Sequence, residues 1–184
     1  FCTLLVTLTT MLAAVERNVL LPLSRFPAVV QHAAAEAVRV CANGYAPYSL
    51  FTVGAALLHE DASITAGCNC ENAVFQGSCA ERCAIVTANA LGKRRAVAIA
   101  VYGKSIRPGA PAPPDTSLCT PCGVCRQLLV EVQQLSGCEL DVILVSHDEQ
   151  HAKIMKLSTL LPENFGPVDL GMDLEVWSHG NPKP

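Results

Sequence analysis

Two segments of the chain are largely apolar on both sides of the strand that each would form. They are residues 52–59 (TVGAALLH) and 96–102 (AVAIAVY). A strand with apolar side chains in both directions is buried on both faces, so other layers must lie above and below its sheet. The two segments therefore predict a layered protein in which helices cover both faces of a sheet.

Helices and further strands surround these two segments. Three segments rich in Ala, Val or Leu are each followed by glycine, which commonly ends a helix, at 28–42, 79–91 and 122–135. Three more short runs predict strands at 64–68, 141–146 and 152–157. The order of these elements predicts an α/β protein with five strands and helices on both faces of the sheet.

The length of 184 residues allows one domain of about 150 residues and an additional segment. We expect a single domain at 25–184 and an N-terminal extension of unknown role at 1–24. Residues 1–15 are too short to span a bilayer and have no Lys or Arg in front, so we expect an amphipathic helix on the core or on a neighbouring subunit. Because the chain opens on Phe1, we expect a truncated or processed form, in which Met11 could be an original start.

The charge of the chain argues against two classes of partner. Thirteen Lys and Arg stand against 16 Asp and Glu, for a net charge of −3. This balance gives little attraction for nucleic acid or for an anionic membrane, so we expect neither as a partner. Only 16% of the residues are charged, against about 25% in an average protein, which indicates that subunit contacts cover part of the surface.

Ten cysteines are the most unusual feature of the composition. They are neither dense enough nor in a chain short enough for a typical disulfide scaffold, and their clustering favours a metal site. We expect a cytoplasmic protein. The cysteines outside the clusters are expected to be small buried apolar residues: Cys2, Cys41, Cys68, Cys70 and Cys138.

The strongest chemical signal joins two predicted helix starts. Cys79 and Glu81 begin one helix, and Cys122 and Cys125 follow Pro121 at the start of another. Three sulfurs can hold zinc and leave its fourth position open, as in catalytic sites, where zinc lowers the pKa of water to about 7. Glu81 is placed to move a proton beside that open position.

Three thiolates reduce the Lewis acidity of a metal, so their charge must be compensated. The two helix N-termini each supply about half a positive charge, and Arg82 or Arg126 could donate hydrogen bonds to the sulfurs. Arg82 could instead pair only with a carboxylate.

The spacing is the cysteine form of the H-x-E and P-C-x-x-C pattern of zinc nucleobase deaminases. The sequence resembles the small cytidine deaminases of pyrimidine salvage from residue 42 to about residue 170. Five segments carry the resemblance in the order of the family: 48–56, 67–73, 79–82, 121–127 and 160–167. It implies a three-layer α/β/α fold with a central mixed five-stranded sheet, and a homotetramer with active sites at subunit contacts.

The resemblance also implies an activity and its residues. Cytidine and deoxycytidine would be hydrolysed to uridine and deoxyuridine, with one zinc per subunit on Cys79, Cys122 and Cys125, and with Glu81 as the proton shuttle. The implied substrate-binding residues are Phe51 near the base, Asn69 and Glu71 on the ribose, Ala80, and the aromatic residues Phe75 and Phe165, which would reach a neighbour's pocket.

Three features depart from the pattern of the family. Phe75 stands where the family often has Tyr, the stretch 69–79 is one residue shorter than usual, and a proline-rich insertion at 103–119 is longer than usual. The insertion could line or cover the pocket.

Other interpretations remain open at the level of sequence. Cys83 could complete a closed four-cysteine structural site, and Cys119 forms a C-x-x-C-x-x-C run of the kind found in iron–sulfur proteins. His59, His147 and His151 are expected to be solvated or hydrogen-bonded and not catalytic. The substrate could also be a nucleoside-like antibiotic or a base within RNA or DNA, or the chain could be a metal-stabilised interaction module without activity.

Overall fold

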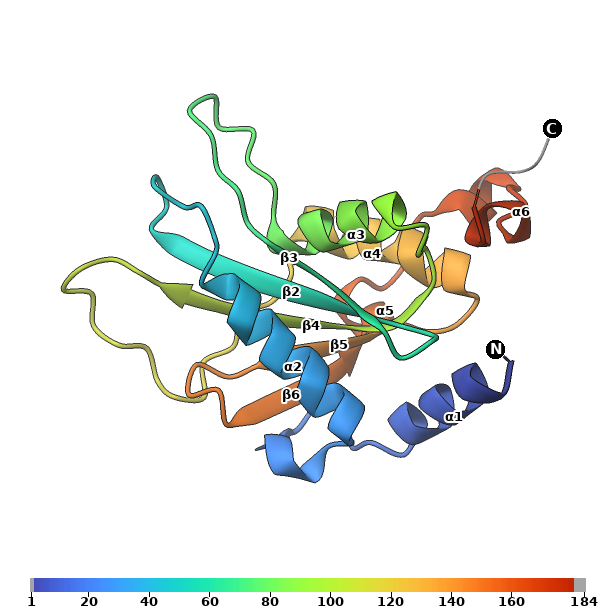
Figure 1. Ribbon diagram of the computed structural model, residues 1–184, viewed down its shortest axis with the longest axis horizontal. Helices are drawn as coiled ribbons and strands as arrows, with labels where there is room; N and C mark the ends of the chain where they lie inside the picture. The colour runs from blue at the N-terminus through green and yellow to red at the C-terminus, as the bar shows by residue number, and fades with distance from the viewer. Residues whose placement is uncertain (1, 181–184) are drawn as a thin grey trace.

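The computed structural model describes residues 2–180, and for residues 2–7 only the backbone. Its sheet has the strand order β1-β6-β5-β4-β2-β3 (Figure 1). The strands are β1 (Leu20–Pro22), β2 (Phe51–His59), β3 (Ile64–Cys68), β4 (Ala96–Ser105), β5 (Asp141–Val145) and β6 (His151–Lys156). Only β4 and β5 pair in parallel among these neighbours, so the sheet is mixed.

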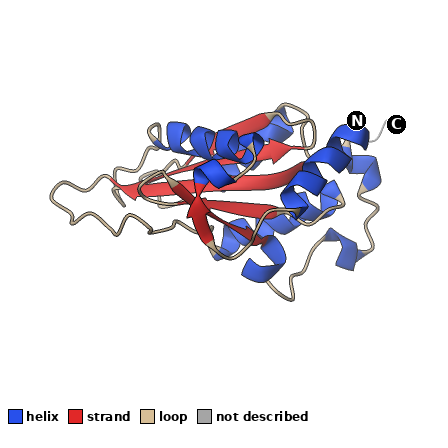
Figure 2. Cartoon of the chain, turned by 90° about the horizontal axis from the view of Figure 1, so that it is seen from below, coloured by secondary structure: helices blue, strands red, loops and turns tan. Residues whose placement is uncertain are grey.

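Helices cover both faces of this sheet, as Figures 1 and 2 show. The helices are α1 (Cys2–Ala13), α2 (Ala28–Cys41), α3 (Ala80–Ala90), α4 (Gly123–Ser136), α5 (Leu157–Leu160) and α6 (Glu175–Ser178), with short 3₁₀ helices η1 (Leu23–Arg25) and η2 (Pro167–Leu170). One apolar cluster lies between the sheet and α2, and a second lies between the sheet and α3 with α4. The expected three-layer α/β/α architecture is confirmed.

The sheet has six strands where five were expected. The additional strand, β1, comes from the N-terminal extension and pairs antiparallel with β6, from Leu20 opposite Lys153 to Pro22 opposite His151. A proline is tolerated at this position because β1 is an edge strand. The division of the chain at residue 24 stays a prediction.

The even-numbered and odd-numbered residues of the central strands face different layers. Ala56 and Leu58 of β2 pack in the cluster beneath α2, whereas Ala55 and Leu57 pack beneath α3 and α4. This alternation is the normal geometry of a strand. Because both sets are apolar, both faces of β2 are buried, as the sequence predicted. Within the part of the chain that the structure describes, no helix has the length and apolar character needed to cross a membrane.

The N-terminal extension is fixed to the sheet by Arg17. Its guanidinium donates to both carboxylate oxygens of Asp141, at 2.9 and 2.8 Å, and also to the carbonyl of Leu12 near the end of α1. Leu8 and Leu12 are buried, so α1 packs through part of its surface on the protein. One cation therefore joins the end of α1 to the start of β5.

Arg17→Ala is expected to lower the free energy of unfolding by about 2–4 kcal/mol, because it leaves the carboxylate of Asp141 buried without its partner. Urea denaturation measures this loss. The exposed Arg25 provides a control, Arg25→Ala, with an expected change of less than about 0.5 kcal/mol. In the double variant with Asp141→Asn, the loss should be smaller than the sum of the two single losses. Additive losses would contradict the pairing.

His59 is a buried, hydrogen-bonded histidine, as the sequence analysis expected. Its Nδ1 lies 2.8 Å from the carbonyl oxygen of Arg95 and its Nε2 lies 2.8 Å from Oγ1 of Thr65. Burial lowers the pKa of His59. The hydrogen bond to the carbonyl of Arg95 and the nearby carboxylates raise the pKa but do not cancel the effect of burial. The neutral imidazole satisfies both partners, so the side chain is suited to the core in its uncharged form.

The lowered pKa of His59 predicts how stability varies with pH. As the pH falls below about 6.5, the unfolded chain binds a proton on this histidine while the folded protein does not, so the free energy of unfolding decreases. His59→Gln should flatten this dependence between about pH 7 and pH 5. Urea denaturation at several pH values tests the prediction, and an equally steep dependence in the variant would contradict it.

Candidate active site

Three cysteine sulfurs meet where α3 and α4 begin. Cys79 and Cys122 are the N-terminal caps of the two helices, and Cys125 lies in the first turn of α4. The three sulfurs all lie within 4.8 Å of one another, and Sγ of Cys79 is 3.9 Å from Sγ of Cys122. Tetrahedral zinc with Zn–S bonds of about 2.3 Å separates its sulfurs by about 3.8 Å, so this arrangement fits zinc.

The same cluster excludes two alternatives left open by the sequence. Among the described residues, the group of potential ligands contains neither Cys83 nor Cys119. Cys83 faces β3 instead, where its Cβ would lie 2.9 Å from a Cβ placed on Gly67. A closed four-cysteine site and a ligand run through Cys119 are therefore wrong for this structure, and a three-sulfur site remains.

The helix N-termini stabilise a negative charge on one of the sulfurs. Burial opposes ionisation of Cys122, but the backbone N–H groups of Cys125 and Val124 lower the pKa of its thiol. Burial raises the pKa of Cys79 and of Cys125, and the negative charges of the neighbouring groups raise them further. A divalent cation removes this repulsion, which supports a metal at the centre of the cluster.

Glu81 lies in the first turn of α3 and is only 3% exposed. Burial raises the pKa of its carboxyl above the usual range, against the opposing effects of its own backbone N–H and of the Cys125 thiol. A raised pKa makes the carboxylate a stronger proton acceptor than an ordinary glutamate, and the same group can then return the proton. Ala80, between Glu81 and Cys79, is completely buried and keeps this turn against the second apolar cluster.

The two arginines near the cysteines differ in their contacts. Arg126 donates from Nε to the carbonyl of Pro121 at 2.8 Å and from Nη1 to the carbonyl of Leu160 at 3.0 Å, so these groups bind backbone and not sulfur. Arg82 is partly buried on α3, and its charge opposes the rise that burial causes in the pKa of Cys83. Compensation of the zinc-site sulfurs by Arg82 stays a prediction.

Asn69 and Glu71 fix the segment after β3 to the start of β2. Asn69 accepts from the N–H of Val53 at 2.8 Å through Oδ1 and donates to the carbonyl of Phe51 at 2.9 Å through Nδ2. The side chain thus extends the pairing of β2 and β3 by one step.

Glu71 accepts through Oε2 from the N–H groups of Tyr48 and Ser49, at 3.0 and 3.2 Å. Hydrogen bonds from Ser49 and Tyr48 lower the pKa of its carboxyl, which is therefore ionised at neutral pH. A carboxylate has about four acceptor sites, so Glu71 can take a further donor beside these two N–H groups.

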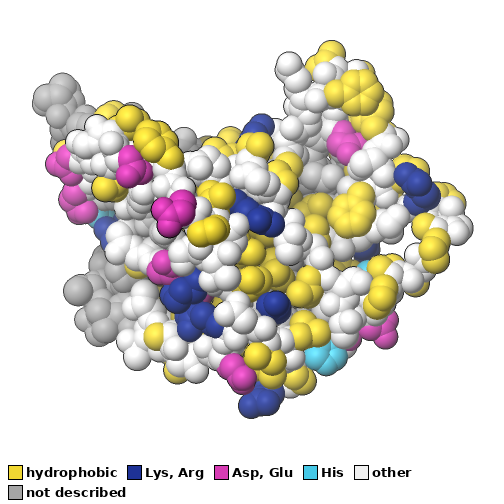
Figure 3. Space-filling view, turned by 180° about the vertical axis from the view of Figure 1, so that it is seen from behind, with side chains coloured by type: hydrophobic (Ala, Val, Ile, Leu, Met, Phe, Trp, Pro, Cys, Tyr) yellow, Lys and Arg dark blue, Asp and Glu magenta, His cyan; other side chains and the backbone are white. Residues whose placement is uncertain are grey.

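The three aromatic residues of the predicted site are all exposed. Phe51 is 39% exposed, Phe165 is 59% exposed and Phe75 is 82% exposed. Phe75 lies on the loop between β3 and α3, where its ring centroid is 5.6 Å from that of Tyr48. Figure 3 shows two loops that project from the molecule, at the upper right and at the right, with hydrophobic side chains on their surfaces.

Gly103 and Cys119 lie beside Phe51, and neither was predicted from the sequence as part of the substrate site. A Cβ on Gly103 of β4 would lie 2.9 Å from Cε1 of Phe51 and 2.8 Å from Sγ of Cys119. The sequence offered one usable signal, a glycine directly after the apolar run 96–102. The expectation that the cysteines outside the clusters are buried is correct for Cys41 and wrong for the exposed Cys70, while Cys68 and Cys138 are only partly buried. The side chain of Cys2 lies outside the described residues.

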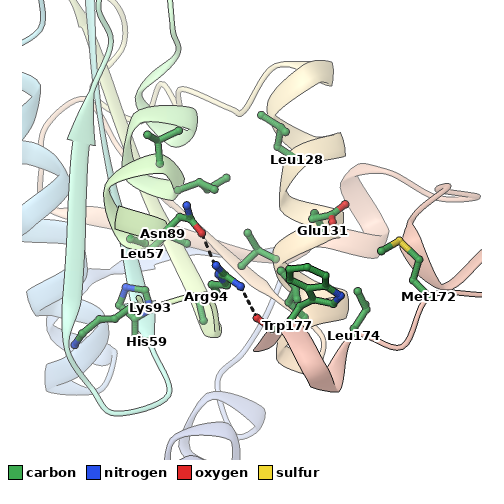
Figure 4. A pocket seen from close by; sticks show the side chains of 16 residues that line it. Leu57, His59, Asn89, Lys93, Arg94, Leu128, Glu131, Met172, Leu174 and Trp177 are labelled. Carbon is green, nitrogen blue, oxygen red and sulfur yellow. Dashed lines mark hydrogen bonds between the residues drawn. The ribbon is translucent and has the colours of Figure 1, made fainter. Parts of the chain in front are cut away.

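A cavity of about 530 Å³ lies away from the cysteines, towards the C-terminal ends of α3 and α4 (Figure 4). Its walls are mainly apolar and include Leu128 of α4 and Leu174 and Trp177 of the C-terminal segment. None of the predicted site residues lines it. Despite its volume, we place the active site at the cysteines, because the reactive groups are there.

Comparisons with known proteins agree with this geometry. The sequence model of the family described as cytidine and deoxycytidylate deaminase zinc-binding region matches residues 28–136. A cytidine deaminase from Halalkalibacterium halodurans is 36% identical over 137 residues, which cover 73% of this chain and 92% of that protein. A cytidine deaminase from Mycobacterium tuberculosis is 37% identical over 136 residues, which cover 73% of this chain and 87% of that protein.

Solved structures give the same result. The crystal structure of cytidine deaminase from Burkholderia pseudomallei matches with a TM-score of 0.61 and 34% identity, and the match covers 73% of this chain and 97% of that one. The structure from Mycobacterium tuberculosis matches with a TM-score of 0.56 and 31% identity, over 72% of this chain and 94% of that one. The chain therefore belongs to the cytidine deaminase family of zinc-binding hydrolytic deaminases.

Proposed function

We propose that this protein deaminates both cytidine and deoxycytidine, giving uridine and deoxyuridine, as a cytoplasmic enzyme of pyrimidine salvage. Family membership supports cytidine deamination itself. The observation that carries the proposal for these residues is the convergence of three sulfurs and the buried Glu81 at the start of α3 and α4. None of the nine described cysteines is in a disulfide, which is usual in a reducing cytoplasm.

In this proposal Cys79, Cys122 and Cys125 hold the zinc, and Glu81 moves the protons. When bound, zinc is a Lewis acid that makes water acidic enough to ionise near neutral pH. Glu81 takes a proton from the attacking water and delivers it to N3 of the cytosine ring. It then takes the proton of the hydroxyl now bonded to C4 and supplies it to the amino group there. The C–N bond breaks as the C4 carbonyl forms, so that water is consumed and ammonia is released. The raised pKa of the buried carboxyl suits both transfers.

The sugar is proposed to bind beside Asn69 and Glu71. The carboxylate of Glu71 can accept a hydrogen bond from a ribose hydroxyl, while the N–H groups of Tyr48 and Ser49 hold it in place through Oε2. No Lys or Arg occurs at 69–72, and the carboxylate repels a phosphate. A free nucleoside is therefore favoured over a nucleotide or a polynucleotide.

We propose a homotetramer in which Phe75 and Phe165 reach neighbouring subunits. Both rings are largely exposed, as is Val74 beside Phe75. Large exposed apolar side chains on a projecting loop are common where a loop packs against a partner. Sedimentation equilibrium should give the mass of four chains, and a monomer at micromolar concentration would contradict this part of the proposal.

One experiment tests the substrate class. Zinc-loaded protein is mixed with cytidine, deoxycytidine, CMP or cytosine, and the decrease in ultraviolet absorbance is followed. We expect turnover of both nucleosides, and kcat/KM values for CMP and cytosine that are lower by about 100-fold or more. Preference for CMP would overturn the sugar assignment, and zinc binding without turnover of any nucleoside would favour a non-catalytic module.

A further inference from the structure

Phe51 and Gly103 share the face of the sheet that carries the cysteine site. In the register of β2 and β4, Val53 lies opposite Gly103 and Phe51 lies opposite Ser105. Val53 packs against the apolar cluster beneath α3 and α4, so the odd-numbered residues of β2 face these helices. Phe51 and Gly103 are thus diagonal neighbours on this face, within reach of a large side chain.

Gly103 leaves space that two other side chains occupy. A Cβ at this position would lie 2.8 Å from Sγ of Cys119, 3.0 Å from its Cβ and 2.9 Å from Cε1 of Phe51. Contacts this short do not occur for real Cβ atoms, so no larger residue fits without a displacement. The thiol of Cys119 and the ring of Phe51 therefore both occupy the space that a side chain at residue 103 would need.

Cys119 is held more firmly than Phe51. It packs against the apolar cluster beneath α3 and α4, and the following residues lead directly to the ligand Cys122. Burial raises the pKa of Cys119 to about 12, so its thiol stays neutral and packs as an apolar group. Phe51 is 39% exposed, so its ring is confined less by neighbouring side chains. A group inserted at Gly103 would therefore push the ring outward.

We propose that Gly103 and Cys119 are positioning residues for the deaminase. They hold the ring of Phe51 in the position where it packs against the cytosine base. This inference rests on the proposed function, in which Phe51 lines the base pocket. Gly103 acts by having no side chain, and Cys119 acts by supporting the ring edge from the side of the core. Neither residue needs to contact the reacting atoms.

The proposal predicts a change in binding and not in chemistry. Phe51 would contact the base equally in the ground state and in the transition state, so its displacement should raise KM and leave kcat nearly unchanged. For Gly103→Ala we expect KM for cytidine to rise about tenfold. For Cys119→Ala, which removes only the sulfur, we expect a rise of about threefold.

The double variant Gly103→Ala/Cys119→Ala distinguishes a displacement of the Phe51 ring from a general loss of folded structure. Removing the sulfur relieves the shortest of the three contacts, so the new methyl group can shift towards residue 119 and away from the ring. KM should then recover in part, from about tenfold to about threefold above the wild-type value. Lys104→Ala is the matched control, because Lys104 is the next residue of β4 and its ammonium faces Tyr102 on the opposite side of the sheet. Zinc content and Tm are measured for every variant.

The outcomes distinguish the inference from the proposed function. Absence of cytidine turnover by the zinc-loaded wild-type protein would contradict the proposed function itself. With an active wild type, unchanged KM in both single variants would overturn the inference. A lower kcat with loss of zinc in Gly103→Ala, without recovery in the double variant, would also overturn it. If Gly103→Ala does not fold, the KM of Cys119→Ala decides alone, and a wild-type value overturns the proposal.

Discussion

Glu81→Gln is expected to lower kcat/KM for cytidine by about 10⁴-fold. Glutamine has nearly the same shape as glutamate, but its amide cannot accept and return a proton. Acid–base catalysis by one side chain contributes about 10²- to 10⁴-fold, and the upper end is expected here because one carboxyl serves the water, N3 and the leaving amine. The three cysteines are untouched, so the variant should still bind one zinc per chain.

Steady-state kinetics and zinc analysis of the same preparation test this prediction. Glu131→Gln is the matched control, because Glu131 is an exposed glutamate of α4, and its activity should equal that of the wild type. A Glu81→Gln variant that retains zinc and more than about a tenth of the wild-type activity would contradict the assignment of the proton shuttle.

Cys125→Ser is expected to remove zinc and to lower kcat/KM by about 10³-fold or more, because two sulfurs alone bind the metal weakly and Lewis acid catalysis is lost. Cys125 is only 1% exposed, so its sulfur is already enclosed between the helix starts. Tm should also fall, because the metal joins α3 to α4. A chelator applied to the wild-type protein should reproduce both losses, and added zinc should reverse them.

Two further cysteines provide controls for the metal site. Cys83→Ser and Cys138→Ser each remove a partly buried thiol that does not belong to the cluster, and both variants should keep zinc and activity. Loss of zinc in Cys83→Ser would favour the closed four-cysteine site that the structure excludes. Full activity in zinc-depleted protein would contradict a catalytic role for the metal.

The main elements of the fold could be predicted from the sequence because local signals coincide with tertiary burial. The apolar run 52–59 became β2 (Phe51–His59), and the segment 28–42 became α2 (Ala28–Cys41). β1 could not be predicted, since it has only three residues, includes Pro22 and depends on pairing with β6 about 130 residues later. β4 continues to Ser105, past the expected end at residue 102, because its last residues pair with the start of β2.

The cysteine cluster was also predictable, because helix geometry places Cys122 and Cys125 on one turn and the resemblance to the zinc deaminases implies that Cys79 lies beside them. The contacts of the surrounding side chains were not. The amide of Asn69 binds the backbone of β2, and Arg126 binds two carbonyls, one of which belongs to a residue 34 positions away. Such partners depend on the path of the backbone, which residue type and spacing do not reveal.

The two residues that follow Cys125 give the zinc end of α4 a mechanical connection to the C-terminal part of the chain. Arg126 holds the carbonyl of Leu160, and Gln127 holds that of Phe165 at 2.6 Å. The stretch between α5 and η2 is therefore anchored near each end by one turn of one helix, although it has no regular structure itself. The position of the Phe165 backbone is therefore tied to the same helical turn that carries Cys125.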